Sequence, residues 1–113
     1  MFAIIEIYQL KATDRNRAVR WQSLANYTAE NGAPNAADYD RVYKCSTAGL
    51  GLANTPESRL KEELYRVFNI EKPADFKGHS LSVSDVIVLG GVAWYVDVYG
   101  FKRIENFKEA IKI

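Results

Sequence analysis

The chain has 113 residues, of which 48% are hydrophobic and 26% charged, an ordinary composition for a folded domain that argues against long disordered segments. Fifteen basic and fourteen acidic side chains leave a net charge of +1, so the basic excess typical of duplex-binding proteins is missing. At this length we expect one domain, residues 1–113, compact and with a single core.

The first predicted elements are a strand and a short helix. Residues 2–10 are rich in β-branched and aromatic side chains on both faces, which favours a strand inside a sheet. Residues 11–17 read as a polar connector. Ser23 is a typical N-cap and Gly32 a typical helix end, so a helix is predicted over residues 24–30.

A second strand and a longer helix follow. Alternation over residues 39–45 predicts a strand with one side formed by Tyr39, Arg41 and Tyr43. Thr55 is a candidate N-cap, and Pro56 fits the first helical position because its missing N–H costs nothing there. The helix then carries one apolar stripe: Leu60, Leu64, Val67 and Phe68.

The clearest pattern in the chain is a hairpin. Two β-rich runs flank Gly90-Gly91, and both glycines can take the positive φ that a type I′ turn needs. A two-residue turn pairs Leu89 with Val92 and brings together an apolar face that we expect to be buried: Ile87, Leu89, Val92, Trp94, Val96 and Val98. The opposite face is mixed and mildly polar, so we expect it to be solvated or to bind something: Ser82, Ser84, Val86, Tyr95, Asp97 and Tyr99.

The spacing of Ile104, Phe107 and Ile111 suggests a last, short amphipathic helix. The predicted fold class is therefore α+β. We expect a single compact domain with an antiparallel or mixed sheet of about four strands and two to three short helices. The predicted order is β-α-β-α-β-β-α.

Cys45 is the only cysteine, which excludes an internal disulfide and fits a reducing compartment. The first residues show no basic leader before Glu6. No apolar run approaches the roughly 20 residues of a membrane-spanning helix. We expect a cytoplasmic protein without a membrane partner.

Several stretches carry a family resemblance. The longest reads PADFKGHSLSVSDVIVL over residues 73–89, and Tyr95-Val96-Asp97 and Gly100-Phe101 follow it. Upstream, IYQLK at residues 7–11, Arg20-Trp21 and Tyr39 to Tyr43 complete the pattern. In these residues, over nearly its whole length, the chain resembles the YodL-like domain.

The resemblance implies a setting among accessory proteins of bacterial mobile elements, standing alone or attached to larger DNA-processing proteins. It implies no assigned biochemical role. Gly90-Gly91 replaces a longer polar loop of the family, and Val98 stands where the family often has Ser. A partner contact made by that longer loop elsewhere in the family would be absent here.

The loop before the hairpin holds the ingredients of a catalytic triad in His79, Ser80, Ser82, Ser84 and Asp85. Side chains that are close along an extended backbone alternate faces, so they do not line up as nucleophile, base and orienter. We therefore predict no enzyme; catalysis would need a pocket joining His79 to an acid from another segment. One histidine and one cysteine give no zinc spacing, and no phosphate-binding glycine loop occurs, so no metal or cofactor is predicted.

Two hypotheses for function remain. The first is a non-catalytic module for an unidentified protein partner, binding through His79, Ser82, Ser84, Asp85, Tyr95, Asp97 and Tyr99. It predicts that changing Tyr95 and Asp97 to Ala leaves the melting temperature nearly unchanged but abolishes partner capture. The alternative is single-stranded nucleic acid, with Tyr95 and Tyr99 stacking on bases beside a basic patch formed by Arg15, Arg17, Arg20, Lys102 and Arg103.

Overall fold

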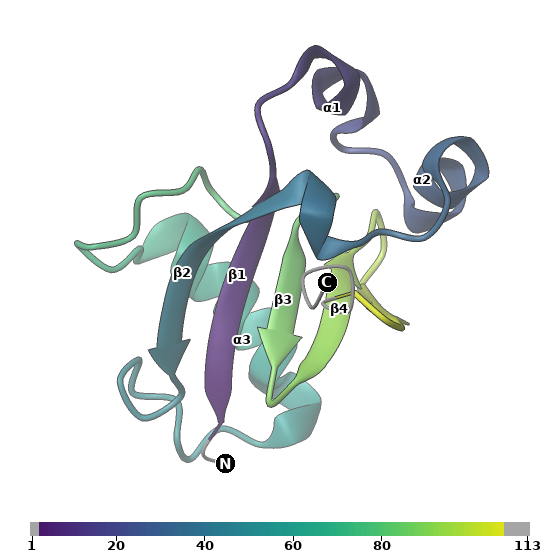
Figure 1. The fold of residues 1–113 in the computed structure, drawn as a ribbon. Coiled ribbons are helices and arrows are strands. Elements are labelled where there is room, and N and C mark those ends of the chain that lie inside the picture. Colours follow the sequence, from purple (N-terminus) through teal and green to yellow (C-terminus); the bar gives the residue numbers. More distant parts are fainter. Residues whose placement is uncertain (1–2, 108–113) are drawn as a thin grey trace.

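A computed structural model describes residues 3–107, which fold around one antiparallel sheet with the strand order β2-β1-β3-β4-β5 (Figure 1). The strands are β1 (Ile4–Leu10), β2 (Tyr39–Ser46), β3 (Val86–Leu89), β4 (Val92–Val96) and β5 (Phe101–Ile104). The helices are α1 (Asp14–Val19), α2 (Leu24–Asn31), a 3₁₀ helix (Ala36–Asp38) and α3 (Glu57–Ile70). The α+β class is confirmed, but a sheet of four strands is wrong because β5 adds a fifth.

The first strand lies inside the sheet, as its two-sided apolar pattern predicts. β1 pairs with β2 on one side and with β3 on the other. Ile5 and Ile7 are fully buried on one face, and Glu6 and Tyr8 are buried on the other. An interior strand must be covered on both faces, so the sheet carries two separate cores.

The alternation predicted for β2 is interrupted by an irregularity. Ile7 pairs with Tyr43 but Tyr8 pairs with Arg41, so Val42 is an extra residue on the β2 side. A bulge of this kind reverses the faces of the residues beyond it. Tyr39 and Tyr43 therefore point to opposite cores, and the prediction that they share a face is wrong.

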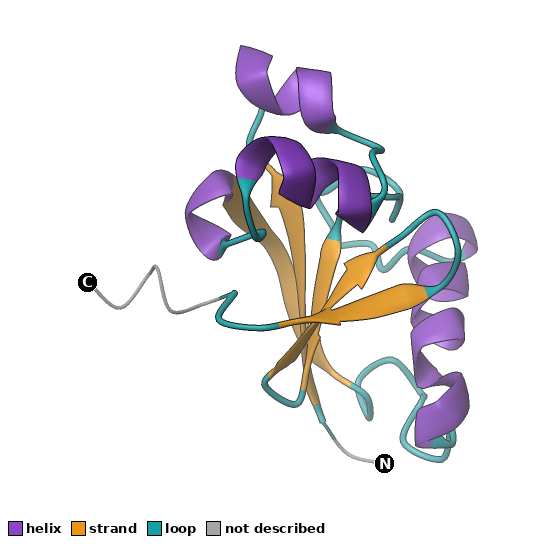
Figure 2. Cartoon of the chain, turned by 90° about the vertical axis from the view of Figure 1, so that its right-hand side faces the viewer, coloured by secondary structure: helices purple, strands orange, loops and turns teal. Residues whose placement is uncertain are grey.

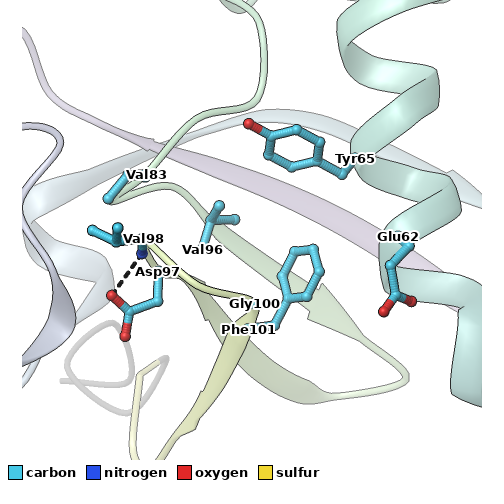
Figure 3. A pocket seen from close by; sticks show the side chains of 8 residues that line it. All are labelled: Glu62, Tyr65, Val83, Val96, Asp97, Val98, Gly100 and Phe101. Carbon is cyan, nitrogen blue, oxygen red and sulfur yellow. Dashed lines mark hydrogen bonds between the residues drawn. The ribbon is translucent and has the colours of Figure 1, made fainter.

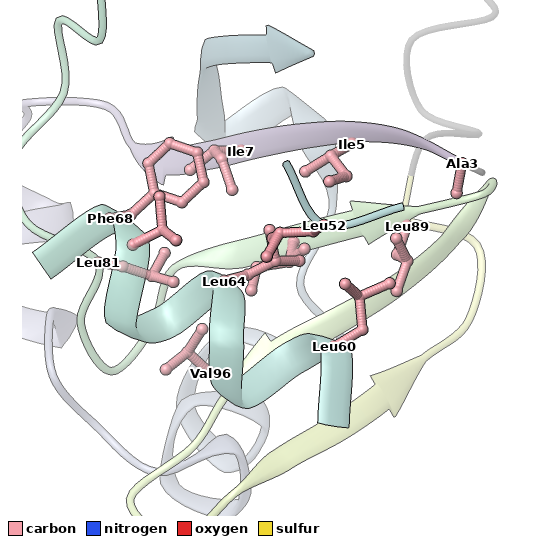
Figure 4. Close-up of a cluster of buried hydrophobic side chains, with 12 residues drawn as sticks. Ala3, Ile5, Ile7, Leu52, Leu60, Leu64, Phe68, Leu81, Leu89 and Val96 are labelled. Carbon is pink, nitrogen blue, oxygen red and sulfur yellow. The ribbon is translucent and has the colours of Figure 1, made fainter. Parts of the chain in front are cut away.

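The long helix α3 covers one face of the sheet (Figure 4). Its predicted apolar stripe is confirmed, because Leu60, Leu64, Val67 and Phe68 are all buried. Opposite them lie the side chains from β1, β3 and β4: Ile5, Ile7, Ile87, Leu89 and Val96. Pro56 rather than Thr55 is the N-cap, and its side chain makes no capping bond.

The other face of the sheet is covered by the segment between β1 and β2, residues 13–38, which we call the cap (Figure 2). Tyr27 of the cap is 1% exposed, and its ring lies 6.0 Å from the ring of Tyr95 on β4. Further along the same face, the ring of Phe107 packs edge-on against Tyr8 and Tyr39. This second core is built largely from aromatic side chains, which bury a large area each.

Local hydrogen bonds explain where the cap helices begin and end. The Ser23 hydroxyl accepts from the Asn26 N–H at 3.2 Å, and Gly32 ends α2 with φ +76°, so the predicted short helix is confirmed. Helix α1 arises where a connector was predicted. Thr13 caps it by accepting from the Asn16 N–H at 3.1 Å.

Ile104, which is predicted to begin a helix, ends the strand β5 instead. Ile104 pairs with Ala93 of β4 rather than opening an apolar helical stripe. Lys102 and Arg103 are exposed on this edge strand, and such charges discourage pairing with another chain. The remainder of the predicted helix, to Ile111, lies outside the described residues.

The diglycine turn is confirmed. Leu89 pairs with Val92 and Ile87 with Trp94, and the two glycines have φ of +57° and +85°. Trp94 lies on the predicted apolar face, which packs against α3, but it is only half-buried, and so is Val92. The buried face ends sooner than expected, since β4 stops at Val96 and Val98 is 52% exposed.

Replacing Gly91 by Ala is expected to destabilise the fold by about 1–2 kcal/mol. A Cβ at this position would meet nothing within 4 Å, so the loss would come from the positive φ alone. Gly91→Asn is the matched control, because Asn tolerates this backbone region better. Urea unfolding measures both variants, and an equal loss for Ala and Asn would contradict the backbone explanation.

Candidate functional site

The centre of the sheet face that the sequence marks as a binding surface is buried. Ser84, Asp85 and Tyr95 are 2%, 1% and 0% exposed. The reason is the cap, which packs over this face with Val19, Tyr27 and other apolar side chains. The expectation of a solvated face is therefore wrong for these three side chains, which are not available to a partner in the folded chain, whereas Tyr99 is 87% exposed.

Polar atoms on this face bind the backbone of the link between α1 and α2. The Trp21 N–H donates to the Ser84 hydroxyl at 3.3 Å. The Tyr95 hydroxyl donates to the Gln22 carbonyl at 2.7 Å, and the Leu24 N–H donates to an Asp97 carboxylate oxygen at 3.2 Å. These bonds fasten the cap to the sheet.

Trp21 and Ser84 both have positive φ, +68° and +85°, in the region that favours glycine. Ser84 is held there by its N–H donating to Val96 and by its carbonyl accepting from the Tyr39 hydroxyl at 2.7 Å. Burial raises the pKa of Tyr39 and of Tyr95 above the ordinary value, so both phenols stay protonated and donate. The backbone strain at this junction is offset by these hydrogen bonds.

The loop that carries His79 is held by one side chain, that of Gln9 at the end of β1. The Gln9 carbonyl oxygen accepts from the His79 N–H at 3.1 Å, and its amide nitrogen donates to the His79 carbonyl at 2.8 Å and to Asp85 at 3.1 Å. A Cβ on Gly78 would lie 2.5 Å from the Gln9 oxygen, so only glycine allows this approach. We call Gln9, His79 and Asp85 the clasp.

The His79 ring is oriented by a backbone contact. Its Nδ1 lies 2.8 Å from the Ser80 carbonyl oxygen and 3.2 Å from the amide nitrogen of Gln9. Its Nε2 lies 4.0 Å from Asp85, beyond hydrogen-bond distance. Catalysis would need an acid from another segment beside His79. The acid near this ring is Asp85, which comes from the same loop. The neighbouring strand β1 contributes the amide of Gln9 instead of an acid. The geometry is that of a structural loop contact.

Asp85 is a buried carboxyl with a strongly altered acidity. Burial raises its pKa to about 7, opposed by hydrogen bonds from the Ser82 N–H and Gln9 and by the charge of Arg20. The Ser82 N–H donates to Asp85 at 2.9 Å, so this carboxyl binds backbone within its own loop. Asp85 therefore changes charge near neutral pH inside the clasp.

This acidity predicts a pH-dependent stability. The folded pKa, about 7, lies above the ordinary 3.8, so the folded state holds the proton more tightly between these values. The free energy of unfolding is therefore expected to fall as pH rises through this window, by at most about 1.4 kcal/mol per pH unit from this group, and to level off above it.

The variant Asp85→Asn isolates the contribution of this carboxyl. The Asn side chain keeps an acceptor for the Ser82 N–H but cannot titrate. The fall in the free energy of unfolding that is due to Asp85 should therefore be missing from this variant. Urea unfolding at a series of pH values measures both proteins. Parallel slopes would contradict the assignment of a raised pKa to Asp85.

The thiol of Cys45, on β2, is half-buried on the face of the sheet that α3 covers. Burial and the neighbouring charge of Asp75 raise its pKa to about 11, so it stays protonated at neutral pH and is a poor nucleophile.

Within residues 3–107, no group of three His, Cys, Asp or Glu side chains is placed to hold a metal ion. None of the helices in this range is long and apolar enough to cross a membrane.

The predicted basic patch is divided between different elements. Lys102 and Arg103 line an open groove between β5 and α2, where Arg103 also lies 3.4 Å from Glu105. Arg20 follows α1 and lies over the Trp21 ring, 4.8 Å from its centroid. Arg17 is exposed on α1, and the side chain of Arg15 is outside what the structure describes. Tyr95 is too buried to stack on a base.

An exposed apolar pocket lies between α3 and the turn that joins β4 to β5 (Figure 3). Its volume is about 300 Å³. It is lined by Glu62, Tyr65, Val83, Val96, Asp97, Val98, Gly100 and Phe101. We call it the turn pocket, and of the residues predicted from sequence only Asp97 lines it.

Three large apolar side chains at or beside the turn pocket are exposed: Tyr65 at 39%, Val98 at 52% and Tyr99 at 87%. The sequence pattern predicts Tyr99 as a site residue, places Val98 on the buried face and does not single out Tyr65. A signal was available, because Val98 and Tyr99 stand directly before Gly100, which takes φ +73° at the turn. Apolar residues in a turn are poorly placed for burial.

Comparison with known proteins gives one positive finding. A family model described as "YodL-like domain" matches residues 4–107, nearly the whole chain. No curated protein and no solved structure matches the chain significantly.

Proposed function

The chain belongs to the YodL-like domain family, and we propose that it acts as a non-catalytic protein-interaction module that docks partners through the turn pocket. The observation that carries this proposal is the exposure of Val98 and Tyr99 beside a formed apolar hollow. Tyrosines and apolar anchors near a pocket are typical of energetically important contact sites. An accessory role in a bacterial mobile element is part of the proposal.

The absence of catalysis is supported by what the candidate groups already do. Asp85 accepts from Ser82 and Gln9, and Ser84 accepts from the cap backbone. A catalytic triad requires a serine hydroxyl that is hydrogen-bonded to the histidine ring. Within residues 3–107, no serine hydroxyl makes such a bond to His79. The clasp and the cap contacts use these polar groups for folding.

A paired capture experiment tests the docking surface. The double variant Val98→Ser/Tyr99→Ser should lose crosslinked partners from a host extract, because its apolar anchors are removed. Ile70→Ser is the matched control: Ile70 is 74% exposed on α3 but does not line the turn pocket, so it should capture normally. Equal capture by both variants would refute the assigned surface.

Nucleic-acid binding remains a second candidate for one specific reason. The Trp21 indole is 61% exposed and carries the Arg20 guanidinium over its ring, a combination that can stack on an unpaired base. Trp21 fluorescence should then change on addition of a single-stranded oligonucleotide, with affinity falling steeply as salt is raised. A flat titration at low salt would exclude this candidate.

A further inference from the structure

We propose that the partner docks as an extended acidic segment, which adds a strand to the free edge of β5 beside the turn pocket. This inference rests on the proposed function and adds the binding mode and the chemistry of the partner. Its basis is the position of β5, whose outer edge lies between the turn pocket on one face of the sheet and the groove along α2 on the other.

The outer edge of β5 is open in the part of the chain that the structure describes. β5 is the last strand in the sheet order, and within residues 3–107 it pairs with β4 alone. Figure 2 views the molecule from this side and shows the hairpin of β4 and β5 in front of the other strands. After Ile104 the chain turns away from the edge, because Phe107 packs against Tyr8 and Tyr39. A strand can therefore approach β5 from outside.

The backbone groups at this edge follow from the bonds of Val96, which lies opposite Phe101. The Val96 N–H donates to the Asp85 carbonyl, and its carbonyl accepts from the Ser84 N–H, both at 2.9 Å. Both groups of Val96 are thus used on the side away from β5, so the N–H and C=O of Phe101 point outward. Pairs alternate along an antiparallel ladder, and the same therefore holds for Arg103. These groups can bind the backbone of an added strand.

The two hollows lie where the side chains of an added strand would go. Phe101 is opposite Val96 on the α3 face and lines the turn pocket. Lys102 is opposite Tyr95 on the cap face and lines the groove with α2. Side chains of an added strand alternate between the same two faces. In strand addition the backbone bonds supply affinity and the pockets for alternate side chains supply specificity.

The exposed side chains of β5 itself are two cations, Lys102 and Arg103. Within residues 3–107 Lys102 forms no ion pair. Arg103 pairs with Glu105, but the two side chains are 58% and 74% exposed, so this pair contributes little. The Asp97 carboxylate also lies in this region, where one of its oxygens accepts from the N–H groups of Val98 and Leu24. Glu62 belongs to α3 and not to the edge. An added strand would therefore meet Lys102 and Arg103 directly.

These cations select the partner. Side chains directly opposite each other on paired strands interact, so acids opposite Lys102 and Arg103 would stabilise the added strand and cations would oppose it. The β5 edge of a second copy would bring the same cations against them, which disfavours self-pairing through this edge. An oligonucleotide lacks the repeating N–H and C=O groups with which a strand edge pairs. An acidic peptide is therefore the expected occupant.

The test begins with panning of a displayed random-peptide library on the immobilised full chain. Enriched sequences should place Asp or Glu next to a large apolar residue. One enriched peptide is then synthesised with a methyl group on each backbone nitrogen in turn, and its affinity is measured by fluorescence anisotropy. Methylation should weaken binding about three- to tenfold at every second position, since only alternate N–H groups of an added strand face β5.

Variants of the chain test the charge and the edge separately. Lys102→Gln/Arg103→Gln should bind the peptide about three- to tenfold more weakly, with a smaller loss at high salt. Arg103→Pro removes an outward N–H as well as the charge, so it should bind more weakly than the matched variant Arg103→Gln. These two should unfold at similar temperatures, because proline is tolerated on an edge strand where the missing N–H faces solvent.

Each outcome decides between the levels of the proposal. Methylation that weakens binding without alternation, or not at all, would overturn strand addition, and an affinity unchanged in Lys102→Gln/Arg103→Gln would overturn the acidic partner. In both cases, binding that is lost in Val98→Ser/Tyr99→Ser would leave the turn pocket as the docking surface. Alternating methylation effects with binding that survives Val98→Ser/Tyr99→Ser would keep the edge and overturn the turn pocket. Failure to enrich any peptide would overturn both. Self-association in ultracentrifugation that is lost in Arg103→Pro would overturn the peptide in favour of a second copy.

Discussion

Replacing Tyr95 by Ala is expected to destabilise the chain by roughly 3–5 kcal/mol, the range for deleting a fully buried aromatic side chain. Tyr95 is 0% exposed, its ring packs near Tyr27, and its hydroxyl donates to Gln22. Such a loss is a large part of the stability of a domain of this size. Urea unfolding would show it as a strongly lowered midpoint.

Two control variants divide the effect. Tyr95→Phe keeps the ring and removes only the hydroxyl, so its loss should be about 0.5–1.5 kcal/mol. Tyr99→Ala changes a side chain that is 87% exposed and should stay within about 0.5 kcal/mol of the wild type. An unchanged midpoint for Tyr95→Ala would instead support the sequence-based view that this residue faces solvent.

Replacing Gln9 by Leu is expected to cost roughly 2–4 kcal/mol, because it removes two part-buried bonds to the His79 backbone and one bond to the buried Asp85 carboxyl at once. The amide of Gln9 serves the His79 N–H, the His79 carbonyl and Asp85, and Gln9 is only 3% exposed. Leu has a similar volume, so the loss would report hydrogen bonds rather than a cavity. Urea unfolding measures it.

Gln9→Glu is the informative companion to this variant. It keeps an acceptor for the His79 N–H but places a second carboxyl beside Asp85. At neutral pH and above, the two charges should repel and destabilise the fold, and the loss should shrink as pH falls because a shared proton restores the bond. A loss below about 0.5 kcal/mol for Gln9→Leu would show that the clasp contributes little.

The parts of the fold predicted from sequence are those whose signals are local. The Gly90-Gly91 turn, Ser23 at the start of α2 and the α3 stripe from Leu60 to Phe68 each follow from a few neighbouring residues. β1 was placed inside the sheet because its apolar residues occupy both faces. These patterns need no knowledge of the rest of the chain.

The errors arose where distant segments decide the outcome. Ser84, Tyr95 and Asp97 look like exposed polar groups along the strand, but each hydrogen-bonds to backbone of the cap more than 60 residues earlier. The cap is hard to foresee, since α1 has six residues and little apolar character. A helix is predicted where β5 lies, because the exposed Lys102 and Arg103 of this edge strand interrupt the alternation of apolar and polar residues.

The candidate site shows the same division. The polar residues of the sequence predict a binding site, but several of these polar groups are hydrogen-bonded inside the fold. The turn pocket instead joins Tyr65 of α3 to Val98 and Phe101, more than 30 residues away, and its existence depends on where α3 crosses the sheet. Only the position of Val98 and Tyr99 before a glycine turn hinted at exposure.

We propose that the chain binds through the turn pocket, whereas the cap closes the opposite face of the sheet. The most direct measurement is a two-dimensional amide NMR titration of the labelled chain with a partner identified by the capture experiment. The account predicts shifts concentrated at Tyr65, Val98, Tyr99 and Phe101, with Val86, Val88 and Ala93 unmoved. Shifts centred on those buried residues of β3 and β4, with the turn unaffected, would contradict it.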